Sequence, residues 1–148
     1  MHPTTVAIVA VLVGGALTAL QGPTNARLAA AVNSPVNAAL VSFAVGTVAL
    51  MIVAALLQSR PDVAAARALP WTSWLGGLYG AVFVVAAAYA VPKLGVATTV
   101  TLMIAGQMLL SLVLDHFGFM GMPRQPVSPA RIAGVMMLIG GVLLVRRG

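Results

Sequence analysis

The sequence predicts an all-α membrane protein with five transmembrane helices. Of its 148 residues, 61% are hydrophobic and 7% are charged, whereas a soluble domain carries about 25% charged residues. So few charges cannot cover a water-facing surface, and the apolar side chains must therefore face the lipid bilayer. The apolar residues form five runs of about 20 residues, the length that crosses a bilayer as a helix. These runs use nearly the whole chain, so we expect residues 1–148 to form one transmembrane domain.

The first two spans are separated by a proline-containing cap. The first is expected over residues 5–31, with a kink or break at Pro23, because proline removes a backbone donor and clashes one turn back. Ser34-Pro35 then combines a capping side chain with proline at the first helical position. This pair predicts the start of a second span over residues 35–57, and a polar connection with charged residues follows it.

The third and fourth spans are expected at residues 71–91 and 96–116. Tryptophans at the start of the third span and Tyr89 near its end resemble an interfacial aromatic belt. The segment from Pro92 to Gly95 predicts a tight turn between these two spans.

A loop rich in glycine, methionine and proline precedes the fifth span, which Ser128-Pro129 opens with the same cap pattern. This span is expected over residues 129–146. Only fourteen residues of it, from Ile132 to Val145, are free of charge, so Arg131 must snorkel or the bilayer must thin for the helix to cross.

The eight cationic residues lie near the ends of the apolar runs, where they anchor helices at the membrane surface. This scatter argues against a nucleic-acid partner despite the net charge of +6.

With five spans, four cations fall on the side of the N-terminus and four on the other side: Arg60, Arg67, Arg124 and Arg131 against Arg27, Lys93, Arg146 and Arg147. Orientation normally follows an excess of Lys and Arg in the cytoplasmic loops. The even division predicts either a fixed topology set within individual loops or a chain that inserts both ways up and pairs as an antiparallel homodimer.

Polar residues inside the spans are the candidate substrate contacts, since polar groups at this depth usually mark a site or a helix contact. Gln21 and Asn25 are four residues apart and share a helix face if the helix continues through Pro23. Thr99, Gln107 and Ser111 form a stripe on the fourth span. Gln107 lies about 18 Å from the start of that span, near mid-bilayer. For Gln21 and Asn25, hydrogen bonding between helices or capping is the alternative role.

Asp115 continues this stripe and is the one carboxylate near a span, so with His116 it is the candidate proton carrier. An ion pair with a nearby arginine is the alternative role for Asp115.

Small residues at regular spacing predict close helix packing, and the glycines concerned are Gly76, Gly80, Gly134, Gly140 and Gly141. The sequence contains no metal-ligand cluster, catalytic set or phosphate loop, so we expect neither an enzyme nor a cofactor.

Five motifs follow one another along the chain: Gln21-x-x-x-Asn25, Trp74-x-Gly76-Gly77-x-x-Gly80, Pro92-x-x-Gly95-x-x-Thr98-Thr99, Gly106-Gln107 and Asp115-His116-Phe117-Gly118. Together they resemble the YdcZ-like family of small bacterial inner-membrane proteins in the drug/metabolite transporter superfamily. The resemblance implies a multi-pass inner-membrane location and a five-helix unit that exists singly with dual topology, as oppositely oriented pairs, or fused into ten-helix chains. The last helix also resembles the dimerising helix of small multidrug resistance exporters, but the acid of their first helix has no counterpart, since Gln21 lies nearest.

We therefore expect a small secondary transporter, an exporter of small polar or amphipathic molecules. It would work by alternating access as an antiparallel homodimer, a ten-helix inverted repeat with its site near the midplane. Its partners would be the lipid bilayer, a second copy and an unknown small-molecule substrate. The competing functions are a channel or passive pore, and a non-transporting partner or scaffold subunit.

Overall fold

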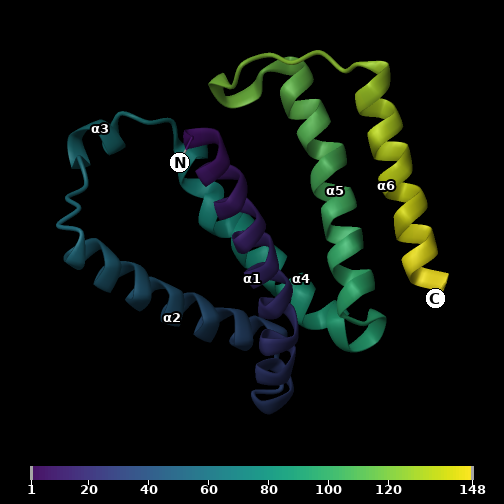
Figure 1. Ribbon diagram of the computed structural model, residues 1–148. Coiled ribbons are helices and arrows are strands. Elements are labelled where there is room, and N and C mark those ends of the chain that lie inside the picture. The colour runs from purple at the N-terminus through teal and green to yellow at the C-terminus, as the bar shows by residue number, and fades with distance from the viewer. Residues whose placement is uncertain (1, 148) are drawn as a thin grey trace. The chain divides into compact units, whose positions relative to one another are not determined.

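The computed structural model describes residues 2–147, and within that range it is helical with no strand. Five of the described helices are long and apolar enough to cross a membrane, as the sequence predicts. The chain divides into two compact units, one ending at Lys93 and the other starting at Leu94. Figure 1 labels the elements of both units, which are described here one at a time.

The first unit begins with two long helices, α1 (Pro3–Ala31) and α2 (Pro35–Leu56). The chain stays helical through Pro23, so no break occurs there, and the ribbon of α1 bends without interruption (Figure 1). Proline leaves the carbonyl one turn earlier without a backbone donor, which a membrane helix tolerates when other groups compensate. The Ser34 hydroxyl accepts a hydrogen bond from the Asn37 N–H at 3.2 Å, which confirms the predicted cap of α2.

The first unit continues with α3 (Val63–Arg67), the 3-10 turn η1 (Trp71–Leu75) and α4 (Gly76–Leu94). The end of α4 differs from the sequence expectation, because the helix runs through Pro92 instead of turning there. The helix ends at Leu94, three residues beyond the predicted end at residue 91. Gly95 follows it with a φ of +79°, which suits a residue without a side chain.

Small residues hold the helices of the first unit together. Ala29 of α1, Ala38 of α2 and Ala88 of α4 form the buried cluster, with Leu28 and Val32 packed against it. Because these side chains are short, the helix backbones approach closely. The rest of α2 diverges from the other two helices (Figure 1), and its large side chains are exposed. Lipid is the medium that accommodates so much apolar surface.

The second unit is a helical hairpin made of α5 (Val96–Phe117) and α6 (Pro129–Arg147), which run antiparallel (Figure 1). Gly118 ends α5 in the left-handed conformation, with a φ of +64°. The short turn η2 (Phe119–Gly121) and an extended segment then lead to α6. The Ser128 hydroxyl accepts from the Arg131 N–H at 3.3 Å, so the second predicted cap is also confirmed.

Candidate functional site

The two polar residues of α1 occupy different environments. Gln21 is exposed, whereas Asn25 is buried, with 3% of its surface accessible. The Asn25 amide nitrogen has no hydrogen-bond partner among the described residues. A buried amide donor left unpaired costs about 1–3 kcal/mol. Asn25 is thus a buried polar side chain that lacks a hydrogen-bond partner for its amide nitrogen among the described residues.

The stripe on α5 consists of residues with three different degrees of exposure. Thr99 is buried, Ser111 is half-buried and Gln107 is exposed. The Thr99 hydroxyl donates to the Gly95 carbonyl at 2.7 Å, and the Ser111 hydroxyl donates to the Met108 carbonyl at 2.9 Å. Both hydroxyls are therefore satisfied within their own helix, which leaves Gln107 as the residue of this stripe with an uncommitted amide. The five predicted substrate contacts are divided between the units, two in the first and three in the second.

The end of the α5–α6 hairpin carries a polar network around Asp115. Arg131 lies at the start of α6, and its guanidinium is 3.2 Å from the Asp115 carboxylate. The two side chains are 34% and 42% exposed, so this pair lies at the edge of the hairpin. The same guanidinium donates to the carbonyl and the side-chain oxygen of Gln125, whose N–H donates to the Asp115 carbonyl at 2.8 Å. Asp115 is thus already engaged as the partner of an arginine.

His116 takes part in the same loop through its ring and its backbone. The Nδ1 atom accepts from the Val127 N–H at 3.3 Å, and the His116 carbonyl accepts from the Nε of Arg124 at 2.9 Å. A ring nitrogen that accepts a hydrogen bond carries no proton, so this contact requires Nδ1 to be deprotonated. The loop partners Arg124, Gln125 and Val127 were not predicted, because only the hairpin brings together residues that are 8 to 11 positions apart.

The predicted packing glycines also fall into two groups. A side chain at Gly80 would lie 3.2 Å from the Phe43 ring of α2, so this glycine permits a close helix contact within the first unit. No heavy atom lies within 4 Å of the position that a side chain would take at Gly76, Gly134, Gly140 or Gly141. These four positions are open to another helix or to lipid.

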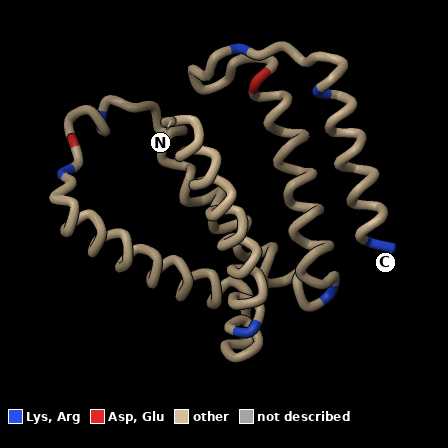
Figure 2. The backbone as a smooth tube through the Cα atoms, in the orientation of Figure 1, with Lys and Arg blue, Asp and Glu red and all other residues tan. Residues whose placement is uncertain are grey.

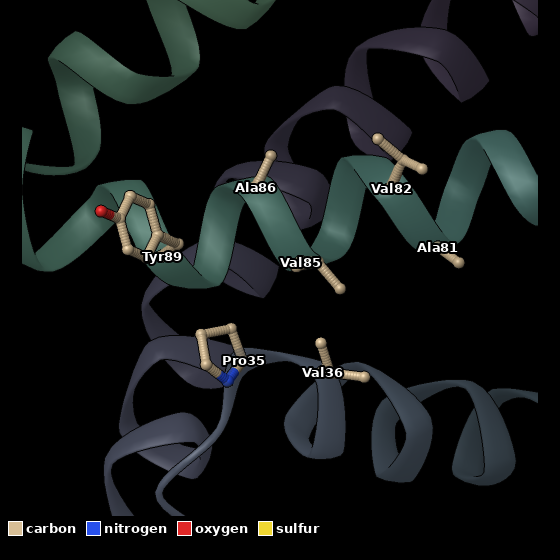
Figure 3. A pocket seen from close by; sticks show the side chains of 7 residues that line it. All are labelled: Pro35, Val36, Ala81, Val82, Val85, Ala86 and Tyr89. Carbon is tan, nitrogen blue, oxygen red and sulfur yellow. The ribbon is translucent and has the colours of Figure 1, made fainter.

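An apolar groove lies between the start of α2 and the middle of α4, with a volume of about 440 Å³. Figure 3 shows the residues that line it, and Tyr89 brings the one polar side-chain group among them. The Lys93 ammonium lies 3.4 Å from the centre of the Tyr89 ring, at the end of the same helix. The lining residues are Pro35, Val36, Ala81, Val82, Val85, Ala86 and Tyr89. None of the predicted substrate contacts is among them.

Charged residues gather at helix ends and connections, as Figure 2 shows. In the first unit two arginines lie in the connection from α2 to α4. Arg27 and Lys93 lie near the C-terminal ends of α1 and α4, at the other end of this unit. In the second unit Arg124 and Arg131 lie at the loop end of the hairpin, and two arginines end α6. Each unit therefore divides its four cations two and two between its ends.

These features define a class of protein: a small multi-pass α-helical membrane protein, with apolar spans, interfacial cations and a few polar groups at depth. No group of three or more potential metal ligands occurs among the described residues. The family model described as "Putative inner membrane exporter, YdcZ" matches residues 6–144. The chain belongs to this family and is a multi-pass protein of the inner membrane.

A curated relative agrees with this assignment. The chain is 30% identical to the inner membrane protein YdcZ of Escherichia coli (strain K12) over 77 residues, which are 52% of each chain. The match thus spans about half the length of that relative. No solved structure matches the chain. The family description fits a membrane transporter and names no substrate.

Proposed function

We propose that this protein is a secondary transporter that exports small polar or amphipathic molecules. The family description supports export. The observation that carries the mechanism is the even division of cations in each unit, because orientation in the membrane depends on an excess of Lys and Arg on one side. A chain without that excess inserts in both orientations, and two opposite copies form an antiparallel homodimer.

The antiparallel homodimer supplies a route to alternating access. Two five-helix domains related by inversion make a ten-helix assembly of the inverted-repeat kind, with the substrate bound near the midplane. Such an assembly opens to either face when its two subunits exchange conformations. Gly134, Gly140 and Gly141 of α6, all open in one chain, are the residues at which the second copy packs.

Gln21, Asn25 and Gln107 each contact the substrate, and Thr99 and Ser111 are the further candidate contacts. Gln21 and Gln107 are exposed, so their amides are available to a ligand or to the second copy. Asp115 is paired with Arg131, and this ion pair is the role that we expect for it. Proton coupling through Asp115, with His116 as its alternative, is the competing role.

The orientation test uses a tag at each terminus of the full chain. Each tag is probed with an impermeant label on right-side-out and inside-out membrane vesicles. We expect both tags to be accessible from both faces in comparable fractions. A single accessible face for each terminus would remove the homodimer mechanism.

The transport test uses purified protein in proteoliposomes and the variant Gln107→Leu. We expect saturable, gradient-driven flux that falls about tenfold in the variant, since one hydrogen bond to the substrate is lost, while helicity and elution volume stay unchanged. Thr101→Val is the matched control, because that hydroxyl donates to the Ala97 carbonyl of its own helix. Unitary conductance in planar bilayers would instead identify a channel.

A further inference from the structure

Asn25 stands apart from the other polar residues of the spans. Six hydroxyl-bearing side chains of the helices donate to carbonyls three or four residues earlier: Thr18, Thr24, Thr47, Thr99, Thr101 and Ser111. An asparagine side chain carries two N–H donors. Those of Asn25 are buried and have no acceptor among the described residues.

The surroundings of Asn25 do not explain this missing bond. The other buried residues on the same part of α1 are Gly22, Ala26 and Ala29, which offer no side-chain acceptor. The buried residues of α4 are alanines and valines as well. A purely structural residue at this position would be apolar, because an unpaired polar group in a membrane has no water to bind. The donor therefore points to an acceptor that binds from outside the chain.

Pro23 makes this part of α1 adjustable. It lies two residues before Asn25 and removes one backbone hydrogen bond from the helix. A side chain at the adjacent Gly22 would lie 3.2 Å from Val91 of α4, so the glycine allows the two helices to approach at this level. A helix weakened at this point can shift against its neighbour and expose the buried amide.

The distribution of acids restricts the charge of the ligand. The sequence has two acidic residues. Asp62 caps α3 by accepting the Ala65 N–H at 2.9 Å, and Asp115 is paired with Arg131. No free carboxylate therefore remains within the spans to neutralise a bound cation, whereas the net charge of +6 favours anions.

We infer that the Asn25 side-chain N–H groups donate to an oxygen acceptor of the transported molecule. The substrates are neutral or acidic solutes that carry hydroxyl, carbonyl or carboxylate oxygens, and organic cations are excluded. This inference rests on the proposed transport function and narrows its substrate class. Neutral and acidic solutes share the acceptor oxygen, and the experiment separates them.

The flux experiment compares three small radiolabelled probes in proteoliposomes: tetramethylammonium, erythritol and glycerate. The first is a cation without an acceptor, the second is neutral and the third is an anion. We expect flux of erythritol, glycerate or both to exceed that of tetramethylammonium at least about tenfold, and Asn25→Asp to reverse this preference, because the new carboxylate repels anions and attracts cations. Thr24→Val is the matched control, since Thr24 is exposed and bonded to Leu20 of its own helix.

A second measurement is independent of transport. The chain has three asparagines, at positions 25, 33 and 37, so selective ¹⁵N labelling gives three side-chain amide signals, and Asn25→Asp identifies one by its loss. We expect erythritol or glycerate to shift the Asn25 signal saturably and tetramethylammonium to leave it in place, with the exposed Asn33 and Asn37 unmoved.

The two measurements separate the inference from the function on which it rests. Flux of any probe with an unmoved Asn25 signal, or tetramethylammonium flux equal to the others, overturns the inference and leaves transport intact. A shifted Asn25 signal without flux of any probe supports the binding role and contradicts the transporter. An unmoved signal together with no flux counts against both.

Discussion

Gly118 ends α5 in a backbone conformation that residues with a side chain avoid. Its φ is +64°, and a side chain there would lie 3.1 Å from the Met122 carbonyl oxygen. The glycine therefore sets the direction in which the chain leaves α5. The polar network of Asp115, Gln125 and Arg131 depends on that direction, because it joins the end of α5 to the loop and to the start of α6.

Gly118→Ala should lower the free energy of unfolding by about 1–2 kcal/mol, the cost of a left-handed alanine. Thermal unfolding in detergent measures this change. Gly14→Ala is the control, because that glycine lies inside α1 with open space around it, and the substitution there should be neutral or slightly stabilising. Equal midpoints for wild type and Gly118→Ala would show that α5 ends differently.

Asp115→Asn separates the two roles of this residue. Its ion pair with Arg131 is partly exposed, and such pairs contribute at most about 1 kcal/mol. We expect the variant to unfold slightly earlier and to keep its transport rate and pH profile, as the ion-pair role requires. Flux that no longer responds to a proton gradient, in a folded variant, would instead assign proton transfer to Asp115.

At the scale of the element, the helices differ in how they use their small residues. α4 uses Gly80 to admit the Phe43 ring of α2 within the chain. α6 keeps the positions beside Gly134, Gly140 and Gly141 open, although Val135 and Val142 on the same helix are buried. This difference indicates that α6 uses one face within the hairpin and leaves other positions open, where we propose that the second copy of the homodimer packs.

Gly134→Leu with Gly141→Leu should therefore prevent dimerisation without unfolding the chain. Light scattering coupled to size-exclusion chromatography in detergent should show a monomer with unchanged helicity. Ile132→Ala, at an exposed position of the same helix that faces away from Gly134 and Gly141, is the control and should leave the dimer intact. A dimer that persists in the double variant would place the interface on another helix.

At the scale of the whole molecule, orientation in the membrane depends on the difference between the numbers of cations at the two membrane faces. Each cation near an anionic membrane surface contributes about 1 kcal/mol. In the proposed dual topology, four cations at each membrane face leave no net preference, and removal of two from one face creates one. The charge balance is therefore a property of all five spans together.

Arg60→Ala with Arg67→Ala should shift the population toward chains whose C-terminus is cytoplasmic. About 2 kcal/mol corresponds to a change of about 30-fold in the ratio of the two orientations. Arg146→Ala with Arg147→Ala should shift the ratio the other way, which makes each pair the control for the other. Terminal-tag accessibility measures the ratio, and identical ratios in both variants would indicate a topology that these charges do not control.

The sequence by itself determined the helical class, the number of spans and the two Ser-Pro caps. All of these follow from composition and from local backbone chemistry, which a single chain segment carries by itself. The tertiary structure decided what depends on residues distant in sequence. It paired Asp115 with Arg131 across the hairpin, buried Asn25 without a partner while Gln21 stayed exposed, and carried α4 through Pro92 to Gly95. Helical periodicity assigns residues to a face, but only the neighbouring helix determines whether that face is buried and which groups find a hydrogen bond.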